Sequence, residues 1–337
     1  MLFNQWGKMA RDLPPGVDIP IMHPHHRNMP IGMCLGGKGF IPNISERQFY
    51  ESGYMNAVTK FDDIINARAS GYGDDLAWTK TATMGGVSGV WYSLFRYAGT
   101  PGTIAPGNIN TGTTMNNASQ GALGLVTPTG GRGKYLLTAG VNVSALGFTM
   151  LLLCDLLWCG ANVTTNVGTG AQTVNSNALV RYTSGAGVMM ICAVTTALGA
   201  SAANITFSYL DQGGNAGSSG AVALTASCVV QRLQPVMSSS PFVVLAAGDY
   251  GVTQIVSITV SALMGAGVMD AYLIKPLAFI PTIAATTYVE RDSTAQIDGL
   301  TQLPVGSDNY IGCLGFLGLT SSTTTCTANG MLRTCEG

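Results

Sequence analysis

The chain has 337 residues, of which 47% are hydrophobic and only 10% are charged, and its formal net charge is -1. Average soluble proteins are about 25% charged. This composition excludes a disordered chain, which would combine low hydrophobicity with high net charge, and it excludes a basic nucleic-acid-binding surface. Because so few charges weaken the repulsion between copies, we expect a surface that other protein covers.

No membrane partner is expected either. The longest apolar run covers residues 147–158 and is interrupted by Asp155, whereas a helical span needs about 20 apolar residues. The first residues also lack the basic and apolar regions of a signal peptide.

The chain has eight cysteines, and none of them form a CxxC pair. Three lie within apolar runs, as buried free cysteines do: Cys154, Cys192 and Cys228. We therefore predict reduced structural thiols and assembly in the cytoplasm. The alternative is a disulfide among the three cysteines nearest the C-terminal end: Cys313, Cys326 and Cys335.

Residues 1–44 are predicted to form an extended arm, because their prolines are spaced too closely for a helix and three glycines follow. Such a segment has little core of its own and becomes ordered by lying on another surface. Phe3, Trp6 and Met9 give it an apolar anchor, and we expect them to contact a partner. The alternative is that they fold back on their own domain.

A helix is predicted over residues 45–68. Ser45 and Gln48 have the spacing of a capping box, apolar residues follow at mostly helical intervals, and the helix should end near residues 69–71. Residues 45–134 are thus expected to be a helix plus a loop-rich region, with one or two short strands and room for a short helix over residues 85–120. A Pro/Gly turn cluster at residues 128–134 marks the predicted boundary.

Residues 135–337 are predicted to form a β-sandwich or jelly-roll-like domain, so the fold class is mainly β. Short runs of Val, Thr, Leu and Tyr alternate with Gly, Asn and Ser turns at roughly regular spacing. Residues 318–330 are either a last strand or a tail. The candidate strands are Ala145–Leu157, Leu179–Arg181, Gly187–Thr195, Asn204–Tyr209, Ala221–Cys228, Phe242–Ala246, Gly251–Ser261 and Ala271–Pro276.

The sequence predicts no catalytic, cofactor or metal site, and no enzyme. All three histidines lie in the arm, at His23, His25 and His26, without an accompanying cluster of acids or cysteines. The paired acids at 62–63 and 74–75 are interpreted as a solvated helix face and a turn, because adjacent helical residues point apart. The glycine-rich run at 129–134 lacks the spacing of a phosphate-binding loop.

Strand and turn phrases follow one another along residues 148–280. They are LLLCDLLW (151–158), QTVN (172–175), RYTSGAGV (181–188), VTTALG (194–199), ITFSYLDQG (205–213), LAAGDYGV (245–252) and YLIKPL (272–277). In these phrases the chain resembles a group of structural proteins from tailed bacteriophages, of the capsid decoration or minor head type. Cys154 and Cys159 stand where aromatic or polar residues would be expected in that group.

The resemblance implies a non-enzymatic virion protein. The first hypothesis is a decoration, cement or minor head protein that stabilises the shell through its arm. Its partners would be the major capsid protein or other virion proteins, together with copies of itself, as a trimer if it sits at threefold positions. One alternative is a tail, collar or fibre component that contacts the host. Another is the major capsid protein, although that shell fold needs a long central helix and more charge.

Overall fold

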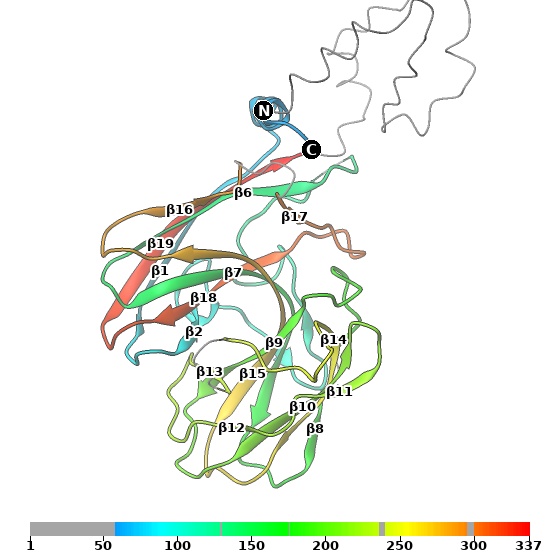
Figure 1. Ribbon diagram of the computed structural model, residues 1–337, viewed down its shortest axis with the longest axis vertical. Helices are drawn as coiled ribbons and strands as arrows, with labels where there is room; N and C mark the ends of the chain where they lie inside the picture. The colour runs from blue at the N-terminus through cyan, green and yellow to red at the C-terminus, as the bar shows by residue number, and fades with distance from the viewer. Residues whose placement is uncertain (1–57, 129, 175, 236–239, 295–299) are drawn as a thin grey trace, which may run out of the picture. The chain divides into compact units, whose positions relative to one another are not determined.

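The computed structural model describes residues 58–337, except 129, 175, 236–239 and 295–299, and these residues form a mainly β structure (Figure 1). From Val58 onward they belong to one compact unit. The mainly β fold class predicted from the sequence is confirmed. The predicted arm, with Phe3, Trp6 and Met9, lies outside the described residues.

Helix α3 spans Phe61–Ala69 and is shorter than the helix predicted from residue 45. Residues 58–60 are not helical, so the prediction of one continuous helix to residue 68 is wrong; its predicted start lies outside the described residues. The Asp63 carboxylate explains the break, because it accepts hydrogen bonds from the backbone N–H of Thr59 at 2.9 Å and of Lys60 at 3.0 Å. The end at Ala69 agrees with the prediction.

The first sheet, called sheet A, has six strands in the order β16-β6-β19-β1-β3, with β17 also paired to β6. Its pairings are antiparallel and join strands from both ends of the described chain. The strands are β1 (Asp75–Gly85), β3 (Gly99–Thr100), β6 (Lys134–Val143), β16 (Val289–Asp292), β17 (Thr301–Leu303) and β19 (Thr325–Glu336).

The second sheet, sheet B, has eight strands in the order β13-β9-β15-β7-β18-β2, with β4 and β5 also paired to β7. The long strands β7 and β15 run antiparallel to each other over most of their length. The strands are β2 (Trp91–Ser93), β4 (Gly107–Asn108), β5 (Thr113–Thr114), β7 (Phe148–Thr164), β9 (Met189–Thr196), β13 (Leu233–Gln234), β15 (Val268–Pro281) and β18 (Cys313–Thr320). A 3-10 helix, η2 (Leu94–Arg96), follows β2.

The third sheet, sheet C, has five strands in the order β11-β10-β14-β8, with β12 also paired to β10. In β10 the buried and partly exposed residues alternate strictly after the first position, as expected for a sheet with one face in a core. The strands are β8 (Ala171–Thr173), β10 (Asn204–Asp211), β11 (Ala216–Ser218), β12 (Val222–Ala223) and β14 (Val252–Val260).

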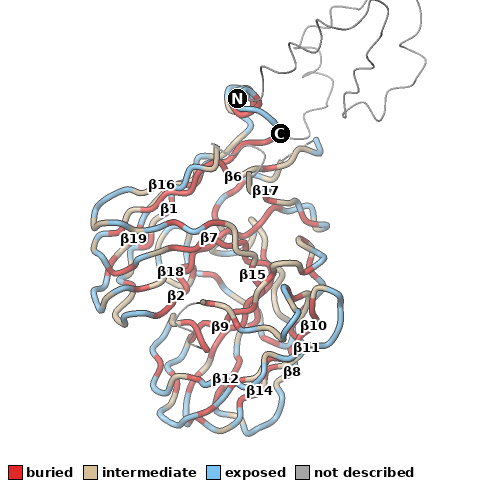
Figure 2. Tube along the Cα trace, in the orientation of Figure 1, coloured by how far each residue is buried: buried red, intermediate tan, exposed pale blue. Residues whose placement is uncertain are grey.

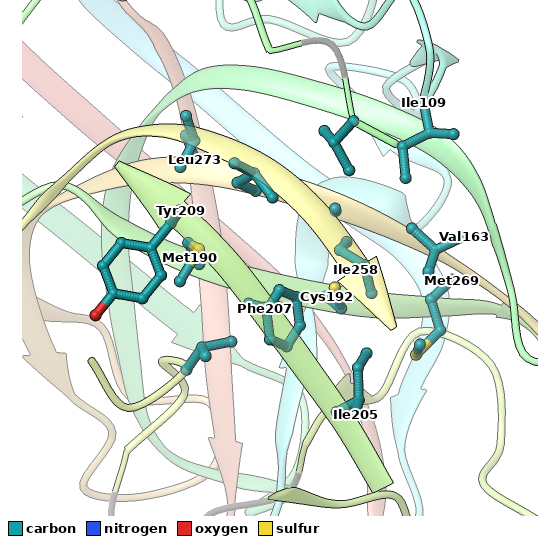
Figure 3. Packing of buried hydrophobic residues seen from close by; sticks show 14 of the residues in the cluster. Ile109, Val163, Met190, Cys192, Ile205, Phe207, Tyr209, Ile258, Met269 and Leu273 are labelled. Carbon is teal, nitrogen blue, oxygen red and sulfur yellow. The ribbon is translucent and has the colours of Figure 1, made fainter. Parts of the chain in front are cut away.

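Sheet B contributes to three apolar cores. Its strands β7, β9 and β15 consist mostly of buried residues (Figure 2). Leu151 and Leu153 of β7 pack with residues of sheet A, which we call the A–B core. Leu157, further along β7, packs with residues of sheet C, which we call the B–C core. Figure 3 shows part of the B–C core, with Phe207 of β10 facing residues of sheet B. The opposite face of sheet B packs under the segments around η2 and β5.

Five of the candidate strands correspond to long strands of the structure: β7, β9, β10, β14 and β15. Leu179–Arg181 and Phe242–Ala246 are not strands, and only Val222–Ala223 of the segment Ala221–Cys228 is one. These segments make isolated contacts in place of a ladder: the N–H of Val243 donates to the carbonyl of Met190, and the N–H of Ala246 donates to the hydroxyl of Tyr209.

Elements on the two sides of residue 134 are hydrogen-bonded to each other. Strand β1 pairs with β19, β2 pairs with β18, and β4 and β5 pair with β7. Lys134 itself opens β6. The boundary near residues 128–134 stays a prediction about chain organisation, and it is not a break in the hydrogen-bonded sheets.

Candidate functional site

The paired acids of the sequence do not face a common cleft. Asp63 caps α3, as described above, and Asp75 forms an ion pair with Arg68. Asp74 instead lies 2.6 Å from the Nζ of Lys134, a fully buried ammonium that is also 3.3 Å from Glu336. These three acids therefore serve local structure, and the interpretation of 74–75 as a plain turn missed the buried partner of Asp74.

The described cysteines have the properties of unreactive, structural thiols. All seven are buried and free, which agrees with the prediction of reduced thiols and not with a disulfide near the C-terminal end. Burial raises the pKa of the Cys159 thiol to about 12 and that of Cys335 to about 11. Thiols with such pKa values carry little thiolate near neutral pH and are poor nucleophiles.

The histidines of the sequence lie outside the described residues. Within the described part of the chain, no group of three or more His, Cys, Asp or Glu side chains has the arrangement of a metal site. No helix in that part is long and apolar enough to cross a membrane.

The most completely buried ion pair of the described residues is that of Asp155 and Arg181, whose side chains are both 0% exposed. The guanidinium donates through Nε to Oδ2 at 3.1 Å and through Nη2 to Oδ1 at 3.0 Å. Nη2 also donates to the carbonyls of Met115 at 2.6 Å and Leu156 at 3.2 Å. This pattern is the bidentate geometry in which arginine binds a carboxylate most specifically.

Asp155 lies on β7 between the two cores that the strand serves. Leu153 belongs to the A–B core and Leu157 to the B–C core. The N–H of Cys313 on β18 donates to the same carboxylate at 3.0 Å. Desolvation outweighs the attraction of Arg181 and raises the pKa of Asp155 to about 6. The pair therefore lies on β7 at the position between the residues of the two cores.

Two more polar groups lie beside this pair. Lys275, opposite Asp155 in the ladder of β15 and β7, donates to the carbonyl of Ala186 at 2.7 Å and lies 5.5 Å from the ring centre of Tyr182. The Tyr182 hydroxyl and the Nη1 of Arg181 have no hydrogen-bond partner among the described residues. In the sequence, the visible signal was Asp155 itself, a lone charge inside the longest apolar run.

Arg96 and Asp270 form a second buried ion pair, next to Asn162 of β7. The guanidinium is 2.9 Å from the carboxylate, and Tyr272 donates to the same oxygen at 3.3 Å. Burial raises the pKa of Asp270, while Arg96, Tyr272 and a hydrogen bond from the backbone of Asn162 oppose that rise. Arg96 comes from η2, so this pair ties the segment after β2 to sheet B.

Lys80 is a buried cation whose ammonium donates to backbone carbonyls. Its Nζ donates to the carbonyls of Tyr97 at 3.1 Å and Pro101 at 2.7 Å. Burial lowers the pKa of Lys80 to about 8. A void of about 10 Å³ beside it is lined mainly by aromatic and aliphatic side chains, a volume at the lower limit for one water molecule. The arrangement fits a structural clamp on the segment after η2.

A larger hollow on the surface encloses about 620 Å³, and we call it the amide groove. Its polar lining comes from Asn108, Asn110, Asn162, Thr164, Gln172 and Thr173. Ile109 and Val167 add apolar surface, and no described residue that lines it carries a charge. The groove thus offers neutral hydrogen-bonding groups only.

Large apolar side chains are exposed at many places on the described surface. They occur on α3, on the sheets and in loops, and Ile283 reaches 71% exposure. Three of them lie near one end of β7 and β15: Leu146, Phe279 and Ile283.

Comparison with known proteins adds little. No protein-family model and no curated protein matches the sequence. A chain from the structure of infectious bursal virus derived T=1 particles matches at 10% identity, over 78% of this chain and 77% of that chain, with a TM-score of 0.15. A TM-score this low supports no conclusion about fold or function, so the comparisons show no family to which the chain belongs.

Proposed function

We propose that the chain is a structural component of a virus particle, specifically a decoration, cement or minor head protein of a tailed bacteriophage. The observation that carries this proposal is the surface. Large apolar side chains, such as Phe61, Tyr250 and Ile283, are more than half exposed on a chain that is only 10% charged. Such a surface favours burial against other protein.

The sequence resemblance supports the same proposal. Most of its phrases lie on the strands β7, β9, β10 and β15 or at their ends. They therefore belong to the framework of the B–C core and not to one variable loop. A framework made of buried strands is consistent with a structural role.

A decoration protein acts through mass action. A protein that binds the assembled shell but not the free subunits stabilises the shell by its binding free energy. We propose that Phe3, Trp6 and Met9 supply apolar contacts to the major capsid protein, and that copies of the chain associate with one another as trimers. No enzymatic step is part of this proposal.

The decisive experiment counts copies of the chain in purified particles by quantitative mass spectrometry, against the most abundant shell protein. Copies in the hundreds beside a distinct shell protein support decoration. A dozen copies or fewer would replace the proposal with a tail or collar component. If this chain were itself the most abundant shell protein, it would be the major capsid protein, and its absence from particles would overturn a structural role.

Rebinding to particles stripped of the protein tests the arm. Trp6→Ala is expected to weaken rebinding about tenfold or more, because a buried tryptophan is a typical hot spot. The control is Thr323→Ala, which changes an exposed polar side chain in the turn between β18 and β19 and should rebind as the unaltered protein does. Equal rebinding of Trp6→Ala and the unaltered protein would overturn the proposed contact.

A further inference from the structure

The amide groove lies beside a bulge in β7, and the bulge determines which side chain enters it. Gly160 pairs with Ala271 and Val163 pairs with Met269, so Ala161 and Asn162 together face one residue of β15. A bulge of this kind re-aims the side chain of the extra residue. Here the backbone of Asn162 has a φ of +71°, a left-handed conformation that asparagine tolerates better than most residues.

Hydrogen bonds to buried groups hold the left-handed backbone of Asn162 in place. It is hydrogen-bonded to the buried carboxylate of Asp270, which is itself paired with Arg96. On the other side, the N–H of Ile109 donates to the carbonyl of Ala161 at 2.7 Å. The position of Asn162 is therefore fixed by buried groups, while its own side chain is exposed in the groove.

The groove offers hydrogen-bonding groups that the protein itself does not use. The side chains of Asn110, Asn162 and Thr173 make no hydrogen bond to another described residue, although each lines the groove. The side-chain Oδ1 of Asn108 accepts from the N–H of Asn110 at 3.0 Å, which leaves the NH₂ of the same side-chain amide unused by the described residues. Each free amide presents a donor and an acceptor side by side.

We propose that the amide groove binds a neutral carbohydrate, a chain of hexose or N-acetylhexosamine units. Vicinal hydroxyls of a sugar are donors and acceptors at the spacing that a planar amide can match. Ile109 and Val167 offer apolar surface for the C–H face of a ring. The lining has no positive charge to pair with a phosphate, sulfate or carboxylate. The proposal goes beyond a structural role and does not depend on it.

A peptide strand fits the groove less well. Gln172 bonds the backbone of Thr164 on both sides, accepting from its N–H at 2.9 Å and donating to its carbonyl at 2.9 Å. These are the backbone groups to which an added strand would bind at this end of β7. The remaining polar groups of the lining are mostly side-chain amides and hydroxyls.

The test is saturation-transfer NMR on the full chain, with hexasaccharides of glucose, mannose, galactose and N-acetylglucosamine at millimolar concentration. A sulfated hexasaccharide and an uncharged hexapeptide serve as competing classes. We expect at least one neutral hexasaccharide to bind and the sulfated one not to bind. No binding of any of the four, or binding of the peptide alone, overturns the proposal.

The location of the site is tested with Asn162→Gly. Glycine adopts the left-handed backbone without strain, so the variant removes the amide and keeps the bulge. Affinity for the bound hexasaccharide should fall about tenfold, as for loss of one or two hydrogen bonds. The matched control is Asn309→Gly, at an exposed asparagine with a φ of +62° outside this groove, which should bind as the unaltered protein does. Equal binding by Asn162→Gly would overturn the site.

Discussion

The A–B core and the B–C core share strands β7 and β15, yet their outer sheets are assembled in different ways. Sheet C takes all its strands from residues 171–260, which follow one another closely in the chain. Sheet A instead brings β1 against β19, and the hydrogen bond from the N–H of Asp74 to Thr334 spans 260 residues. The outer sheet of the B–C core therefore comes from one part of the chain, whereas that of the A–B core is closed by distant segments.

Because of this difference, the residues of β7 between the two cores are the place to test whether the cores unfold together. Asp155 and Arg181 lie where β7 leaves one core and enters the other, and both are fully buried. A local sandwich and a distant one can unfold together only if the shared strands couple them. The following predictions test that coupling, from the largest expected effect to the smallest.

Arg181→Met should lower the free energy of unfolding by about 3–5 kcal/mol, because it leaves the Asp155 carboxylate buried without its partner. Removal of the positive charge should also raise the pKa of Asp155 further. The measurement is urea unfolding at neutral pH. As a control, Arg68→Met breaks the half-exposed pair with Asp75 and should cost about 1 kcal/mol or less. Equal costs for the two variants would show that the buried pair stabilises the fold no more than the half-exposed one.

Leu332→Ala and Leu273→Ala are a matched pair, since both leucines are fully buried, one in the A–B core and one in the B–C core. Each should cost about 2–5 kcal/mol. Because β7 and β15 run through both cores, we expect a single calorimetric transition for each variant, shifted to lower temperature. Two separate transitions in either variant would show that the sandwiches unfold independently.

The pH dependence gives the smallest effect. The pKa of Asp155 is about 6 in the folded protein, against about 3.9 for an unfolded aspartate. The folded state therefore holds the proton more tightly, so this contribution is complete below pH about 4 and is lost as the pH rises through about 6, by about 3 kcal/mol.

Asp155→Asn lacks this titration and provides the reference. The unfolding free energy of the unaltered protein minus that of Asp155→Asn should fall between pH 4 and pH 7 in urea titrations. Asp270, whose pKa burial also raises, is present in both proteins, so its contribution cancels. A difference that rises with pH would contradict a raised pKa.

The same comparison explains what the sequence could predict. Residues 204–209 alternate apolar and polar side chains, and they form β10, where one face meets the core. Strands β9 and β14 were also found from local patterns. In sheet A, β1 was missed because its partner, β19, lies at the other end of the described chain and no local turn links the two. Periodicity detects a strand more readily when its neighbours are close in sequence.

The amide groove shows a similar limit. Its asparagines stand at positions 108, 110 and 162, and only the parallel pairing of β4 with β7 brings them together. One local signal existed: Gly160 inside a strand pattern indicates a bulge or a close backbone approach. The predicted contacts Phe3, Trp6 and Met9 lie outside the described residues and stay predictions.

The pairing of β1 with β19 also sets an order of events during synthesis. A ribosome adds about 5–20 residues per second, and a growing chain can form only the contacts whose partners have already emerged. Sheet C is complete once residue 260 has emerged, whereas β1 must wait for residues 325–336. Until β19 has formed, β1 lacks its partner between itself and β6. The unpaired backbone edge of β1 is then open to pairing with another chain. Where several ribosomes translate one mRNA, the nascent chains lie close together, and the unpaired β1 is the strand at which we expect mispairing between chains to begin.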